Sequence, residues 1–117
     1  MNNKLINIQG NVLWLAQAVL GILLVVLLSI HLIVNHWAAP QGLLTYADVI
    51  RYYDFPGVAI MEAIFLIVVT SHCLLGLYSI LLDLNLRPFV TRILAQILVI
   101  LGVIMVVYGV YLITRLV

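Results

Sequence analysis

Three apolar stretches, each long enough to cross a lipid bilayer, constrain this chain more than any other feature. They run over about 12–34, 57–82 and 93–116. Each has at least the roughly 20 residues that a helix needs to span a hydrocarbon core. Lipid offers the backbone no hydrogen-bond partners, so each stretch is predicted to be a transmembrane helix. The apolar share of 67% and the charged share of 8% also lie outside the range of soluble domains.

The connections between these stretches predict one further helix. After the breakers Pro40 and Gly42, Thr45 can cap a short helix over about 45–54. Its apolar and aromatic residues recur at helical spacing, which is typical of a segment lying flat at the membrane surface: Tyr46, Val49, Ile50 and Tyr53. The second connection is short and polar, and Pro88 suits the first turn of the last helix. We therefore expect an all-α membrane protein with one domain, residues 1–117.

The charges of the chain are few but still informative. A formal net charge of +1 without a basic cluster argues against a nucleic-acid partner. Lys4, Arg87 and Arg92 fall on one predicted side of the membrane, and Arg51 and Arg115 on the other. Cytoplasmic loops carry the excess of basic residues, so the N-terminus is expected to be cytoplasmic. The first apolar stretch is too long for a signal peptide and is expected to stay as an anchor.

Ionisable residues inside membrane helices are costly and mark functional sites. The chain has His31, His72 and Glu62 in such positions. The helical rise puts the two histidines about 12 Å apart along the membrane normal, with His31 nearer the outer side. At different depths they cannot both bind one iron. Each is expected either to ligate a separate haem or to make an interhelical hydrogen bond.

The residues around the histidines refine these hypotheses. Gly76 follows His72 by one helical turn, where a missing side chain would let a flat macrocycle approach. His36 is expected at the outer interface, hydrogen-bonding locally or touching a quinone or a haem propionate. Glu62 lies at about the depth of His31, as a proton carrier near an outer quinone site or as a partner in an ion pair or hydrogen bond.

Two segments resemble a known family, the cytochrome b membrane anchors of succinate:quinone oxidoreductase (complex II). The first is His31-Leu-Ile-Val-Asn-His36-Trp37-Ala-Ala, and the second is His72-Cys-Leu-Leu-Gly76-Leu-Tyr78. The second segment, with Gly76 four positions after His72 and an acid, Asp83, seven positions after Gly76, also resembles the small anchor subunits of the single-haem enzymes. The order and separation of the segments resemble the di-haem anchors, and the resemblance covers about residues 12–90.

The resemblance implies a function that composition cannot supply. His31 would ligate an outer haem b and His72 an inner one, each completed by a histidine of a second anchor subunit. The chain would be half of a haem-binding helix bundle in the plasma (inner) membrane of a prokaryote. It would attach the iron–sulfur and flavoprotein subunits of succinate dehydrogenase or fumarate reductase and pass electrons to a quinone, with menaquinone favoured.

This chain would therefore serve electron transfer without a dehydrogenase site of its own. It has no glycine-rich nucleotide fingerprint, and its single cysteine, Cys73, cannot form an iron–sulfur site. Leu84 stands where related single-haem anchors often carry a quinone-binding tyrosine. Asp83, Asn85 and Arg87 could still line a pocket or contact the iron–sulfur subunit.

Two other interpretations remain open from sequence. The chain could be a haem-free structural anchor or assembly subunit of a respiratory complex, with structural histidines. It could also be a small transporter that uses Glu62 as a proton-coupled carboxylate, although this leaves both histidines unexplained.

Overall fold

The chain forms four helices, three of them long. The computed structural model describes residues 3–39 and 41–117. Helix α1 covers Asn3–Ala38, α2 covers Tyr46–Tyr53, α3 covers Pro56–Asp83 and α4 covers Pro88–Leu116. Helices α1, α3 and α4 are each long and apolar enough to cross a membrane. The predicted fold class, three membrane-spanning helices and one short helix, is confirmed.

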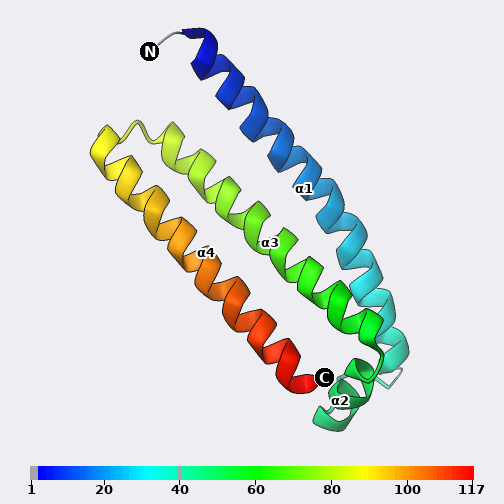
Figure 1. Ribbon diagram of the computed structural model, residues 1–117. Helices are drawn as coiled ribbons and strands as arrows, with labels where there is room; N and C mark the ends of the chain where they lie inside the picture. Colours follow the sequence, from blue (N-terminus) through cyan, green and yellow to red (C-terminus); the bar gives the residue numbers. More distant parts are fainter. Residues whose placement is uncertain (1–2, 40) are drawn as a thin grey trace.

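The long helices run alongside one another and define two ends of the molecule (Figure 1). The N-terminus of α1 and the turn between α3 and α4 lie at one end, called the turn end here. Helix α2 and the C-terminus of α4 lie at the other, the α2 end. The basic residues group by end as expected, since Arg87 and Arg92 belong to the turn end, and Arg51 and Arg115 to the α2 end.

The helices extend beyond the apolar stretches that predicted them. Helix α1 begins at Asn3 rather than near residue 12, and α4 begins at Pro88 rather than near residue 93. Hydropathy marks where lipid can contact a helix, whereas the helix itself continues until a cap or breaker ends it. Pro88 is such a start signal. Asn85, with a φ of 48°, turns the chain in the left-handed region after α3.

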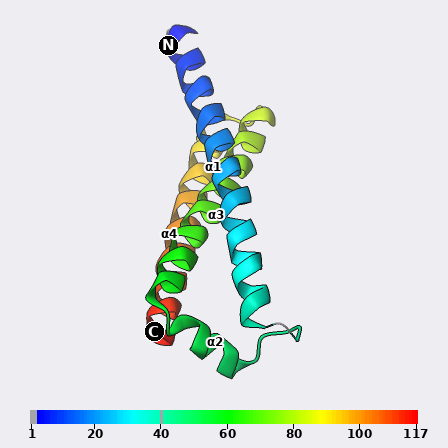
Figure 2. The same ribbon diagram turned by 90° about the vertical axis from the view of Figure 1, so that its right-hand side faces the viewer.

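Helix α2 crosses from α1 to α3 at the α2 end (Figure 2). Thr45 caps it, as predicted, through a reciprocal capping box with Asp48. The Asp48 backbone N–H donates to Thr45 Oγ1 at 3.3 Å, and the Thr45 backbone N–H donates to Asp48 Oδ2 at 2.9 Å. This cap sets where α2 starts and so which of its residues face α3.

Helix α3 is the central element, packing against both α1 and α4. On the α4 side, Gly102 and Gly109 make room for side chains of α3, Leu74 and Leu66 respectively. Gly102 is the buried residue of α4, and most of the large apolar side chains of that helix are exposed. Small residues let membrane helices approach closely, so these glycines hold α3 and α4 together.

Substituting Gly102 by Leu should separate α3 and α4, because the new side chain would occupy the space of Leu74. Overpacking of this kind costs about 1–3 kcal/mol, so we expect a lower thermal unfolding midpoint for the detergent-solubilised protein. Gly10→Leu is the matched control, since a Cβ at Gly10 meets nothing within 4 Å. Equal midpoints for the two variants would contradict this account of the packing.

Candidate functional site

Polar side chains lie along the interface between α1 and α3 in two groups. The first, the Glu62 cluster, consists of His31 and Asn35 on α1, Tyr52 on α2 and Glu62 on α3. The second, the His72 cluster, consists of Gln17 and Gly21 on α1 and His72 and Gly76 on α3. Both bring residues from distant parts of the sequence together at the interface between α1 and α3, called the α1–α3 seam here.

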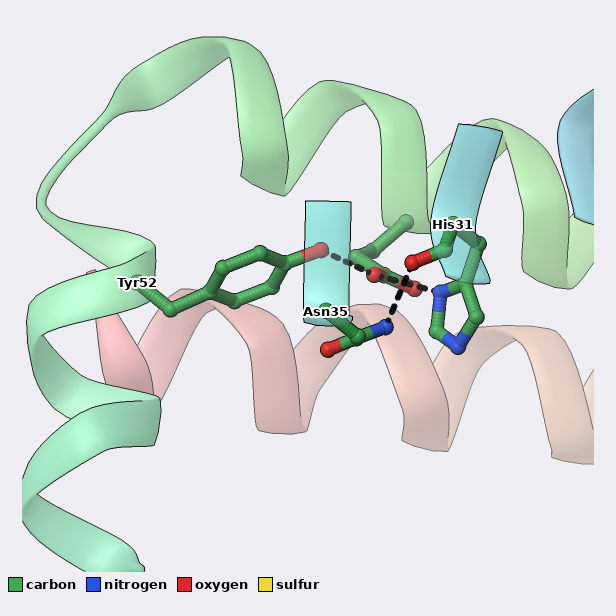
Figure 3. A network of polar contacts seen from close by, with 4 residues as sticks. His31, Asn35 and Tyr52 are labelled. Carbon is green, nitrogen blue, oxygen red and sulfur yellow. Dashed lines mark hydrogen bonds and ion pairs between the residues drawn. The ribbon is translucent and has the colours of Figure 1, made fainter. Parts of the chain in front are cut away.

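The Glu62 cluster centres on one carboxylate oxygen. His31 Nδ1 lies 2.8 Å from Glu62 Oε1, and the Tyr52 hydroxyl donates to the same oxygen at 2.7 Å. The Asn35 side-chain amide donates to the backbone carbonyl of His31 at 2.8 Å. Figure 3 shows these contacts converging from three helices. Glu62 thus links α1, α2 and α3.

Packing also restrains the His31 imidazole. Its ring stacks on Phe65, with centroids 5.0 Å apart and an interplanar angle of 28°. The Glu62 side chain is only 12% exposed, whereas the His31 side chain is 29% exposed. Burial, with the Glu62 hydrogen bond adding to it, raises the pKa of the Tyr52 hydroxyl well above its usual value. Tyr52 therefore remains a protonated donor at neutral pH.

For His31, the interhelical hydrogen bond expected as one alternative is present. It occupies only Nδ1, and the second ring nitrogen points away from the carboxylate (Figure 3). A neutral imidazole whose Nδ1 donates to a carboxylate has its acceptor lone pair on Nε2. The contact with Glu62 is therefore compatible with ligation through the other nitrogen.

The His72 cluster differs because two of its buried polar atoms have no partner among the described residues. His72 Nδ1 and Gln17 Oε1 are both buried without a hydrogen bond to the part of the chain that the structure describes. A Cβ added to Gly21 would lie 3.3 Å from His72 Cε1, so this glycine admits the imidazole. Gly76 faces Gln17, whose Nε2 would lie 3.1 Å from a Cβ there. The space expected above Gly76 thus holds a side chain of α1.

The two clusters lie at different levels of the bundle. His72 is level with Gly21 on α1, and His31 lies ten positions further along the same helix. At the helical rise, that separation is about 15 Å, close to the spacing expected from sequence. The histidines therefore serve two places, with His31 near the α2 end.

The remaining predicted residues lie at the two ends of the molecule. His36 is exposed near the end of α1, and Asp83 and Arg87 are exposed where α3 ends and α4 begins. A surface hollow at the turn end is lined by Asn85, with Tyr78, Thr91 and Arg92 among its other lining residues. Asp83 and Arg87 do not line this hollow, so only Asn85 of the residues proposed for a pocket there does so.

The described residues include no group of three or more His, Cys, Asp or Glu side chains placed to hold a metal ion. Each histidine can offer one ligand to a group that is completed elsewhere. Sequence reasoning missed Gln17, Gly21 and Tyr52 as members of the clusters. The signal for the first two was available, because Gln17 is polar within an apolar stretch and precedes a small residue by one helical turn.

Comparison with known proteins places this chain among membrane anchors. A relative from Archaeoglobus fulgidus, named as a succinate dehydrogenase hydrophobic membrane anchor subunit, is 35% identical over 72 residues. The match covers 62% of this chain and 61% of the relative, so it spans less than two thirds of either. No solved structure gives a significant match.

The family model for the succinate dehydrogenase/fumarate reductase transmembrane subunit matches residues 4–111. That range includes all four helices almost completely, along with both polar clusters. The chain belongs to the family of succinate dehydrogenase/fumarate reductase transmembrane subunits.

Proposed function

We propose that this chain is a haem-binding anchor that joins the iron–sulfur and flavoprotein subunits of succinate dehydrogenase to the membrane and conducts electrons to quinone. The observation that carries the proposal is the state of His72. Its Nδ1 is buried on the α1–α3 seam without a partner among the described residues. No hydrogen bond to the described residues engages the imidazole, so no structural role within the chain competes for Nε2, the nitrogen left to a group from outside the chain. Ligation through Nε2 would give this costly polar side chain a function.

Imidazole is a common axial ligand of haem iron, so the residues fit the group that the family resemblance implies. His72 would hold one haem b and His31, through Nε2, a second. The separation of about 15 Å between their levels excludes a shared iron. Each haem supplies a one-electron redox centre, and the chain contributes a ligand and an apolar environment for it.

Bis-histidine ligation at both levels needs two histidines beyond these. A second anchor subunit would supply them and would cover the exposed faces of the helices. This chain is then half of the haem-binding bundle. Its apolar side chains that remain outside that interface would contact lipid.

We assign the turn end to the cytoplasmic side of a prokaryotic plasma membrane, because more basic residues flank it. The hollow lined by Asn85 and Arg92 opens at this end. Amide and guanidinium groups can hydrogen-bond the carbonyl oxygens of a quinone, so this hollow is the proposed place for its headgroup. The di-haem resemblance favours menaquinone.

A haem-free anchor or assembly subunit is the competing function, and the hydrogen bond between His31 and Glu62 favours it, since it gives one histidine a structural role. The absorption spectrum of the purified complex separates the two. A reducible b-type Soret and alpha band supports the haem-binding anchor, whereas its absence would establish the haem-free one.

Alanine substitutions of the histidines should remove haems one at a time. We expect the intact complex to contain two haems per anchor pair, His72→Ala to lose the inner one and His31→Ala the outer one. Haem quantified by its pyridine haemochrome measures this. His36→Ala is the control and should keep both haems, because His36 is exposed near the helix end. Loss of the same haem in the His31 and His72 variants would contradict the assignment of separate levels.

Removing the guanidinium of Arg92 should weaken quinone binding. Loss of a hydrogen bond to a charged group costs about 1.5–3 kcal/mol, so Arg92→Gln should raise the KM for a soluble quinone about tenfold or more. Steady-state reduction of the quinone by succinate measures this. Arg115→Gln, at the opposite end, is the matched control, and an unchanged KM in the Arg92 variant would exclude the hollow as the headgroup site.

A further inference from the structure

The Glu62 cluster restrains the His31 imidazole through more contacts than a hydrogen bond between two helices would need. One oxygen, Glu62 Oε1, meets both His31 Nδ1 at 2.8 Å and the Tyr52 hydroxyl at 2.7 Å. A carboxylate oxygen accepts both bonds, which requires the Nδ1 position of a neutral His31 to carry the proton. The tautomer is thereby set, and Nε2 is left as the free acceptor.

The orientation of the imidazole is set as well as its tautomer. Phe65 follows Glu62 by nearly one helical turn, so the residue that stacks on the His31 ring and the residue that bonds it come from one face of α3. Asn35 holds the His31 backbone carbonyl from one turn further along α1. The ring therefore has few alternative positions, which suits a ligand more than a group that only bridges helices.

Tyr52 gives the Glu62 carboxylate a second hydrogen-bond donor besides His31. It comes from α2, a short helix outside the membrane-spanning segments, and its hydroxyl reaches Glu62 in α3. A carboxylate in a membrane helix is costly unless its acceptor capacity is used. Because Tyr52 and His31 share one oxygen, the bond from Tyr52 draws electron density away from the bond to His31.

We propose that Glu62 is a positioning residue for His31: it accepts the Nδ1 proton, presents Nε2 to the outer haem, and sets the midpoint potential of that haem, with Tyr52 moderating its strength. This inference rests on the proposed haem-binding function. Histidine ligands of metals commonly donate their second nitrogen to a carboxylate, and loss of that partner typically changes metal affinity or activity about 10–100-fold.

The two contacts of Glu62 predict shifts of opposite sign. Glu62→Gln removes the negative charge behind His31, makes the imidazole a weaker electron donor, and should raise the midpoint potential of the outer haem. A tenfold change in the preference for ferric over ferrous iron corresponds to about 59 mV for one electron, and we expect a shift of about this size. Tyr52→Phe frees Glu62 Oε1 to bind His31 more strongly and should lower the potential.

The experiment is a potentiometric titration of the haem alpha band in the intact purified complex. His31→Ala and His72→Ala, each leaving one haem, assign the two potentials. The inner haem is the internal control, since His72 lies about 15 Å from the Glu62 cluster. Tyr46→Phe is the matched control for Tyr52→Phe, because Tyr46 is on the same helix but 77% exposed. The low-spin electron paramagnetic resonance signal of the outer haem gives a second readout of ring orientation.

A rise in Glu62→Gln and a fall in Tyr52→Phe, both confined to the outer haem, would support the proposal. Unchanged potentials, or equal shifts of both haems, would overturn it. If the complex with Glu62→Gln fails to assemble, the Tyr52→Phe titration decides alone. A lower midpoint potential of the outer haem would support the proposal, and an unchanged potential would contradict it. A wild-type complex without haem would overturn the proposed function itself. If His31→Ala removes the outer haem but neither Glu62→Gln nor Tyr52→Phe changes its midpoint potential, only this inference is overturned.

Discussion

Lipid offers polar side chains no partners, and this constraint organises the interface between α1 and α3. His31, Glu62 and Tyr52 satisfy one another there through a single shared carboxylate oxygen. The arrangement needs α3 in the centre of the three long helices and α2 folded back at their end. The capping box of Thr45 and Asp48 starts α2 at the residue that brings Tyr52 to Glu62.

The two clusters on this interface differ in whether their polar atoms are paired within the chain. In the Glu62 cluster the polar atoms are paired within the chain, so a ligand bound there would meet a preset imidazole. In the His72 cluster, Nδ1 of the histidine and Oε1 of Gln17 stay buried without partners among the described residues. The His31 imidazole is thus oriented by contacts within the chain, whereas the His72 imidazole has no hydrogen-bond partner among the described residues. Both properties suit a subunit that shares its binding sites with another chain, as we propose.

Much of this architecture could be predicted from sequence because hydropathy and capping are local signals. The three spans, the Thr45 cap and the start at Pro88 all depend on residues near one another in the chain. The separate levels of His31 and His72 follow from the helical rise alone. The true start of α1 at Asn3 was missed, because a helix can continue past the segment that faces lipid.

The sequence by itself determined that this chain crosses the membrane in helices and carries two histidines at different depths, since the period and rise of a helix are the same wherever it packs. Only the tertiary structure decided which side chains meet those histidines. Gly21 faces His72, and Gln17 faces Gly76 one turn further along α3, because of how α1 packs on α3. Tyr52 and Glu62 converge beside His31 because α2 also packs on α3. The faces that meet depend on helix rotation and crossing, which long-range packing sets and hydropathy does not encode.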